Sequence, residues 1–184
     1  MIILSFGSNL KSNLGNRKQN IEFAYRELKK NKVRIIKKSA FYETNSYPNK
    51  KNPKFINTVA IVETILDEFK LLQVLLKIEK KAGRTRNIKY DPRTLDIDII
   101  SFNNQVLSIK KNNKKLVIPH KHYKNREFVI LPLEEIAPNW IDPQTNYSIS
   151  QIKSELEKSK LDNIRKLWKI WYKSINAQRK SANR

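Results

Sequence analysis

Acidic and apolar residues alternate along the segment 95–102, and this alternation is the strongest constraint on the fold. In an extended strand, residues two positions apart point to the same side. Asp96 and Asp98 therefore project together, while the leucine and isoleucines around them face the opposite side. The segment predicts a strand that buries one face in a core and presents two neighbouring carboxylates on the other.

The order of the expected elements indicates an α+β fold. Apolar periodicity, capping residues and turn residues predict strands over residues 2–6, 33–44, 55–64 and 95–102, and helices over 17–30 and 68–82. This order of strand, helix, strand, strand, helix, strand is ferredoxin-like: an antiparallel sheet with helices packed on one face. Further helices are expected over 127–136, where Pro132 should disturb the helix, and from about Ser148.

Length and composition bound the class of protein. A single domain over residues 1–184 is expected, with a motif-bearing part of about 1–143 and a basic C-terminal extension of about 147–184. The absence of cysteine excludes disulfides and cysteine zinc sites, and no glycine-rich P-loop or Rossmann motif occurs. No apolar run approaches the roughly 20 residues that span a bilayer, so we expect a cytoplasmic protein without a membrane partner. The formal net charge of +21 favours polyanionic ligands, including a nucleotide triphosphate.

Basic side chains crowd the loop that leads to Asp96, where Arg84, Arg86, Lys89 and Arg93 occur within ten residues. Arginine suits bidentate contacts with phosphate, and carboxylates together with substrate phosphates are the usual ligands of magnesium. Two close carboxylates also repel each other unless a cation relieves the repulsion. The segment therefore indicates a site for metal and phosphate, and a salt-bridged surface loop is the alternative.

Two other groups of polar residues are candidates for ligand binding. His120, Lys121 and Arg126 indicate phosphate contacts, because a zinc site at the histidines lacks a third ligand nearby. Asn57 is polar among apolar strand residues. Its amide must be satisfied either by structural hydrogen bonds or by a ligand such as the edge of a heterocycle.

Several motifs follow one another in the order and spacing of a known family. They are Phe6-Gly-Ser-Asn-Leu10, Ser39-Ala-Phe-Tyr-Glu-Thr44, Phe55-Ile-Asn57, Gly83-Arg-Thr-Arg86, Asp91-Pro-Arg-Thr-Leu-Asp-Ile-Asp98, Ile118-Pro-His120, and Asn125-Arg-Glu-Phe-Val129 leading into Pro132-Leu-Glu-Glu-Ile-Ala-Pro138. Across about residues 1–143 the chain resembles the 6-hydroxymethyl-7,8-dihydropterin pyrophosphokinases of folate synthesis. The loop 45–54 departs from the family pattern because it contains no glycine.

The resemblance implies transfer of the β,γ-pyrophosphoryl group of ATP to the pterin hydroxymethyl oxygen, with release of AMP. It also implies two Mg²⁺ ions held by Asp96 and Asp98, with ATP as co-substrate. The catalytic residues that it implies are Arg84, Arg93, Asp96 and Asp98. The ATP-binding residues that it implies are Arg84, Arg86, Arg93, His120, Lys121 and Arg126. The pterin-binding residues that it implies are Thr44, Phe55, Asn57, Asp96 and Phe128.

The expected partners are therefore small molecules, and we expect a monomer that binds no specific nucleic acid. The main alternative is a basic ferredoxin-like module that binds nucleic acid, which the charge and fold class favour. That alternative leaves Asp96 and Asp98 without a role, because they would repel phosphate in the absence of metal. A second alternative is another metal-dependent phosphotransferase, which release of ADP in place of AMP would reveal.

Overall fold

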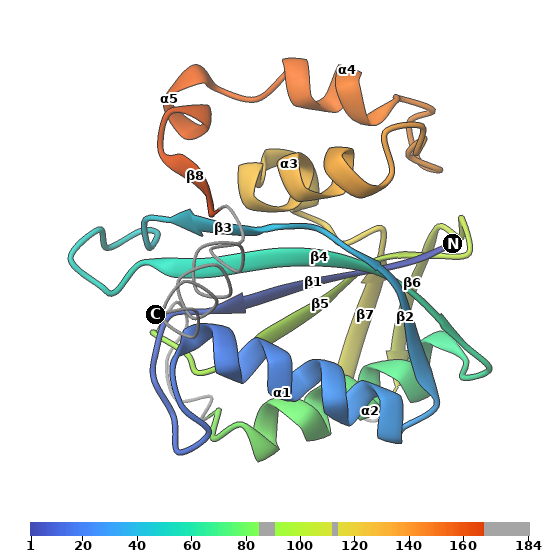
Figure 1. The fold of residues 1–184 in the computed structure, drawn as a ribbon. Coiled ribbons are helices and arrows are strands. Elements are labelled where there is room, and N and C mark those ends of the chain that lie inside the picture. Colours follow the sequence, from blue (N-terminus) through green and yellow to red (C-terminus); the bar gives the residue numbers. More distant parts are fainter. Residues whose placement is uncertain (85–90, 112–113, 168–184) are drawn as a thin grey trace, which may run out of the picture.

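The computed structural model describes residues 1–84, 91–111 and 114–167 (Figure 1). Arg86 and Lys89 of the predicted arginine-rich loop lie outside these residues. In chain order the elements are β1 (Ile2–Ser8), α1 (Arg17–Lys30), β2 (Val33–Lys38), β3 (Phe41–Thr44), β4 (Phe55–Thr64), α2 (Glu68–Lys81), β5 (Asp96–Phe102), β6 (Leu107–Lys111), β7 (Lys114–Ile118), the 3₁₀ helix η1 (Tyr123–Asn125), α3 (Glu127–Ile136), α4 (Ile149–Ser154), α5 (Lys158–Leu161) and β8 (Ile164–Leu167).

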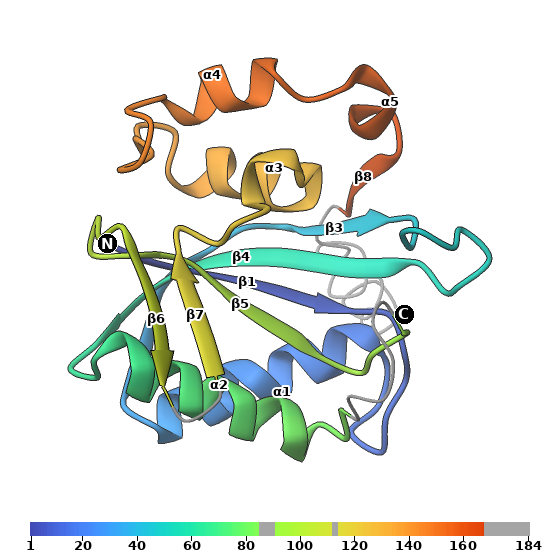
Figure 2. The same cartoon turned by 180° about the vertical axis from the view of Figure 1, so that it is seen from behind.

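The main sheet is antiparallel and has the order β5-β1-β4-β3-β8, while β2 also pairs with β4. The single strand expected over 33–44 is divided into β2 and β3, which pair with different parts of β4. At the break, the hydroxyl of Ser39 accepts a hydrogen bond from the backbone N–H of Val59 at 3.0 Å. The backbone N–H of Ser39 still donates to the carbonyl of Val59 at 2.9 Å, so a side-chain bond and a backbone bond join the strands at the break. Strands β6 and β7 form a separate hairpin (Figure 2).

Helices cover both faces of the sheet (Figures 1 and 2). The α+β class and the antiparallel sheet are confirmed, and α1 and α2 lie together on one face as the ferredoxin-like pattern predicts. Helices α3 and α4 lie on the opposite face, which the order of the first elements did not indicate. Among the described helices, none has the length and apolar character needed to cross a membrane.

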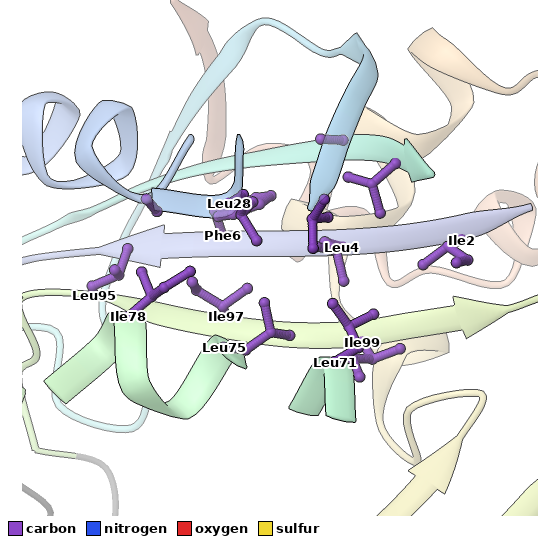
Figure 3. Packing of buried hydrophobic residues seen from close by; sticks show 14 of the residues in the cluster. Ile2, Leu4, Phe6, Leu28, Leu71, Leu75, Ile78, Leu95, Ile97 and Ile99 are labelled. Carbon is purple, nitrogen blue, oxygen red and sulfur yellow. The ribbon is translucent and has the colours of Figure 1, made fainter. Parts of the chain in front are cut away.

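The two faces of the sheet bury separate cores because successive strand residues alternate. Leu4 and Phe6 of β1 point towards α1 and α2, together with Ile97 and Ile99 of β5 (Figure 3). Ile3 points the other way and packs with Val59 and with residues of α3 and α4. The apolar side of the 95–102 segment is thus buried as predicted, and Ile97 is only 5% exposed.

The predicted helix ends agree closely with the structure. Asn16 caps α1 in a capping box, and Asp67 caps α2 by accepting a hydrogen bond from the backbone N–H of Lys70. Gly83 follows the end of α2 with φ +80°, a conformation that costs glycine little. Pro132 lies inside α3 without ending it, so the expected disturbance does not divide this helix.

Residues 147–167, the described part of the expected C-terminal extension, are integrated in the fold. Ser148 caps α4 as predicted, and the buried side chains of Ile149 and Ile152 join the core under α3. Strand β8, which the sequence pattern did not assign, pairs antiparallel with β3. The sheet therefore gains its last strand from a segment more than a hundred residues away from β3.

A buried carboxylate links the two helices on the first face. Glu27 of α1 is 4% exposed and accepts hydrogen bonds at 2.7 Å from Lys30 and from Lys81 at the end of α2. These hydrogen bonds lower the pKa of Glu27, even though burial opposes the shift. A group whose pKa is lowered by folding stabilises the fold above its unfolded-state pKa and loses that effect as the pH falls.

We therefore expect Glu27→Gln to lower the free energy of unfolding by about 1 kcal/mol at neutral pH. The difference from the wild type should shrink as the pH falls from about 7 to about 3, because the carboxyl of the unfolded state then binds a proton while the lower pKa of the native carboxyl resists it. Urea unfolding at both pH values checks this, with Glu22→Gln on the exposed side of α1 as the matched control. An equal destabilisation at the two pH values would contradict the ionic explanation.

Candidate active site

The floor of the candidate site is one row of the sheet, on the face shared with α3. In this row Gly7 of β1 pairs with Asn57 of β4 on one side and with Asp96 of β5 on the other. In the next row Ser5 pairs with Asp98. Directly paired residues of neighbouring strands project from the same face. The prediction that Asp96 and Asp98 project together is confirmed, and the fold brings Asn57 to the same surface.

Because Gly7 has no side chain, its neighbours in this row pack closely against the backbone of β1. A Cβ atom at this position would lie 3.3 Å from Oδ1 of Asn57 and 3.5 Å from Cδ1 of Phe55. The absence of a side chain thus lets the amide of Asn57 lie close over the backbone of β1, while the ring of Phe55 is at an ordinary contact distance.

Asp96 contacts the two arginines that the sequence assigned to phosphate. Nη1 of Arg84 contacts Oδ1 of Asp96, and Nη1 of Arg93 lies 3.0 Å from Oδ2. Burial on its own would raise the pKa of Asp96, but the two guanidiniums outweigh it and hold the pKa below its usual range. Asp96 is therefore ionised at neutral pH and carries the charge that a cation requires.

Glu79 of α2 is a member of this group that the sequence analysis missed. Its carboxylate is 2% exposed, contacts Nη1 of Arg84, and accepts a hydrogen bond at 2.8 Å from the backbone N–H of Ile97. β5 is a border strand of the sheet, and this N–H lies on its outer side. Glu79 therefore accepts a hydrogen bond from the sheet border and also contacts Arg84. Burial tends to lower the pKa of Arg84, but Asp96 and Glu79 raise it overall. A glutamate in the last turns of an amphipathic helix gave no sequence signal of this role.

Asp98 has its own basic neighbours. Nη1 of Arg126 lies 2.8 Å from its Oδ2, and Nε2 of His120 lies 3.7 Å from the same oxygen. Burial is the main cause that lowers the pKa of His120, and the nearby positive charge of Arg126 adds to it, while Asp98 opposes it. His120 is accordingly neutral at neutral pH. Within the described ranges no group of three or more metal-ligating side chains occurs, so the zinc alternative gains no support.

The predicted pterin-binding residues lie beside the carboxylates. Asn57 is 3% exposed, and its Nδ2 donates a hydrogen bond at 2.9 Å to the hydroxyl of Thr44 on β3. The guanidinium carbon of Arg93 lies 5.8 Å from the ring centroid of Phe55. That of Arg126 lies at 5.7 Å from the ring of Phe128. Each of these arginines therefore contacts one carboxylate of the pair and one aromatic ring.

A cavity of about 330 Å³ adjoins Asp98. Its walls come from α2, β5 and β7 and from the segment that follows β7. The lining residues are Leu72, Ile97, Asp98, Ile99, Lys115, Leu116, Val117, His120 and Lys121. Among these residues, the sequence indicated a binding role only for Asp98, His120 and Lys121. The apolar residues of the lining lie on a helix and on strands, where such positions are typical of the core.

Comparison with known proteins identifies the chain's relatives. Residues 3–138 match the sequence model of the family described as 7,8-dihydro-6-hydroxymethylpterin-pyrophosphokinase (HPPK). The chain is 39% identical over 129 residues to a 2-amino-4-hydroxy-6-hydroxymethyldihydropteridine pyrophosphokinase of Haemophilus influenzae, covering 70% of this chain and 75% of that protein. A protein of the same name from Synechocystis is 35% identical over 125 residues, covering 68% of this chain and 62% of that protein.

A solved structure supports the fold independently. The Plasmodium falciparum HPPK-DHPS protein superposes with a TM-score of 0.65 at 18% identity, over 84% of this chain. This chain covers only 44% of that protein. Likewise, it spans 24% of the bifunctional folate synthesis protein of Arabidopsis thaliana.

The fold and these matches first define a class: the chain is a pyrophosphokinase, an ATP-dependent transferase, as the sequence motifs predicted. Within that class, it belongs to the 7,8-dihydro-6-hydroxymethylpterin-pyrophosphokinase family, whose named members act in folate synthesis. The alternative of a nucleic-acid-binding module is not supported by these comparisons.

Proposed function

We propose that the chain transfers the β,γ-pyrophosphoryl group of ATP to the hydroxymethyl oxygen of 6-hydroxymethyl-7,8-dihydropterin and releases AMP. The observation that carries this proposal is the row in which Asn57, Gly7 and Asp96 lie side by side. It places an amide suited to a heterocycle edge next to carboxylates suited to metal-bound phosphates. The reacting alcohol and the transferred phosphates would then meet over β1.

The two carboxylates suit a magnesium ion that is also bound by the phosphates of a substrate. Asp96 and Asp98 supply oxygen ligands from adjacent outward positions of one rigid strand. One or two carboxylates completed by substrate phosphates is the usual arrangement for magnesium, and an all-protein cage is not needed. We propose that these two residues hold two Mg²⁺ ions, which would neutralise charge on the phosphates during transfer.

On the ATP side, we assign Arg84, Arg93, Arg126 and His120 to the phosphates, because they already surround the two carboxylates. Arg84 and Arg93, together with the carboxylates, are the catalytic residues that we propose. The apolar walls of the adjoining cavity suit the nucleoside part of ATP, with Lys121 at its rim. Arg86, also expected to bind ATP, lies outside the described residues.

On the pterin side, Asn57 would read the edge of the ring, and Phe55 and Phe128 would stack on its two faces. Thr44 holds the amide of Asn57, and Asp96 faces the same ligand as well as the metal. The expectations of a monomer and of a cytoplasmic location stay predictions, and light scattering would test the first.

Incubation with ATP, Mg²⁺ and the pterin alcohol tests this assignment directly. We expect AMP in an amount equal to the pterin diphosphate formed, and only when both the pterin and Mg²⁺ are present. Formation of ADP would assign an ordinary kinase, and AMP formation that ignores the pterin would contradict the acceptor that we propose.

The close packing at Gly7 gives a further prediction. In Gly7→Ala the new Cβ lies 3.3 Å from Oδ1 of Asn57, so this amide must move by a few tenths of an ångström, while the ring of Phe55 stays in ordinary contact. We expect the KM for the pterin to rise by about 10-fold, with a much smaller change in the KM for ATP. Steady-state kinetics of the folded variant measures both, and equal effects on the two substrates would contradict a pterin site at this row.

A further inference from the structure

Asn9 is a buried polar residue directly after β1, and the proposed reaction gives it no part. It is 2% exposed. Its side-chain amide has two donor hydrogens and a carbonyl acceptor, and burial requires that these be satisfied. In the structure the two donor hydrogens bond to the loop 45–54, and the acceptor oxygen bonds to Arg93.

The donor side of this amide holds the loop 45–54 at its base. Nδ2 of Asn9 donates to the hydroxyl of Ser46 at 3.2 Å and to the backbone carbonyl of Pro53 at 3.1 Å. The hydroxyl of Ser46 in turn donates to the same carbonyl, which brings the two ends of the loop together. The loop connects Thr44 directly to Phe55, so both of its ends lead into the proposed pterin site.

The acceptor side of the amide holds the backbone of Arg93. Oδ1 of Asn9 accepts a hydrogen bond at 2.6 Å from the backbone N–H of Arg93. The backbone N–H groups of Asn9 and Leu10 donate to the carbonyl of Arg93 at 3.1 and 3.2 Å. The backbone of Arg93 is thus fixed on both sides, while its guanidinium reaches Asp96 and the ring of Phe55.

We propose that Asn9 is a positioning residue that links the loop beside the pterin-binding residues to the arginine on the phosphate side. The inference rests on the proposed function for its kinetic consequences, but the link itself is a property of the fold. Only an amide of this length supplies both donors and the acceptor at this point. Aspartate keeps the acceptor for Arg93 but has no hydrogen for the carbonyl of Pro53, and alanine loses both.

The aspartate and alanine variants therefore test the donor side and the acceptor side of Asn9 separately. For Asn9→Asp we expect the KM for the pterin to rise by about 10-fold, with the KM for ATP within about two-fold of the wild type. For Asn9→Ala we expect the same rise together with a fall in kcat of about 10-fold, because the N–H of Arg93 loses its acceptor and Arg93 is then held only through its carbonyl. Ser46→Ala should reproduce the pterin effect of Asn9→Asp. The matched control is Asn31→Ala, whose amide bonds to the backbone at the end of α1, far from the site.

Amide hydrogen exchange measures the link without any substrate. The backbone amide of Arg93 should exchange faster in Asn9→Ala than in Asn9→Asp, and the amides of 46–52 should exchange faster in both. Unchanged exchange at these positions, or a lower melting temperature with unchanged kinetic constants, would overturn the proposal. If the wild type forms no AMP, the proposed function fails, while the exchange pattern still decides whether Asn9 links the loops.

Discussion

Replacing Asp96 or Asp98 by asparagine should lower kcat for AMP formation by at least about 100-fold, because each change removes a proposed ligand of Mg²⁺. Asparagine keeps the shape of the side chain, so strand β5 and the core behind it should stay intact. The change also leaves Arg84 and Arg93, or Arg126 and His120, facing a neutral amide. Binding of ATP in the absence of metal should therefore weaken little.

The measurement is AMP release at saturating ATP and pterin, with increasing Mg²⁺. Partial recovery at high Mg²⁺ is expected for Asp98→Asn or Asp96→Asn, since a weakened site still binds metal at higher concentration. Asp67→Ala is the matched control: it removes a capping carboxylate from α2 and should change stability only slightly, with kcat unaffected. Wild-type turnover in either site variant, with the fold confirmed by circular dichroism, would show that these carboxylates do not hold the metal.

Replacing Asn57 by alanine should raise the KM for the pterin by about 10- to 100-fold, because the amide that we propose to bind the pterin edge is lost. Oδ1 of Asn57 lies beside Gly7, and Asn57 is not among the residues that line the cavity that we assign to the nucleoside. The affinity for a non-hydrolysable ATP analogue should accordingly remain within about two-fold of the wild type.

Thr44→Val is the companion variant for this prediction. Thr44 accepts a hydrogen bond from Nδ2 of Asn57, so its loss should loosen the amide without removing it. We expect an intermediate rise in the KM for the pterin. A loss of ATP affinity equal to the loss of pterin affinity in Asn57→Ala would place Asn57 outside a dedicated pterin site.

Local patterns predicted the elements that position the carboxylates. The alternation around Asp96 defined both the strand and the two faces of its side chains, and Asn16 and Asp67 marked helix starts through bonds made within a few residues. Such features depend on neighbours along the chain. The same holds for Gly83, whose positive φ ends α2.

Features that depend on distant contacts could not be read in this way. The division of the 33–44 segment occurs where Ser39 bonds to Val59 of β4, and the placement of β8 depends on its pairing with β3. Glu79 resembles any solvated glutamate of a basic helix until the fold brings it against Arg84 and the edge of β5. The apolar walls of the cavity were likewise indistinguishable from core, because only the open space beside Asp98 distinguishes them.

The pairing of β8 with β3 also determines which strand forms the border of the sheet. Without residues 164–167, β3 would present a row of unpaired N–H and C=O groups next to Thr44. Such an exposed strand is a template on which another chain can add. At the opposite border of the sheet, the carboxylate of Glu79 occupies an N–H of β5. Strand β3, which carries Thr44, is thus paired on both sides, and the border of the described sheet lies one strand further from the site.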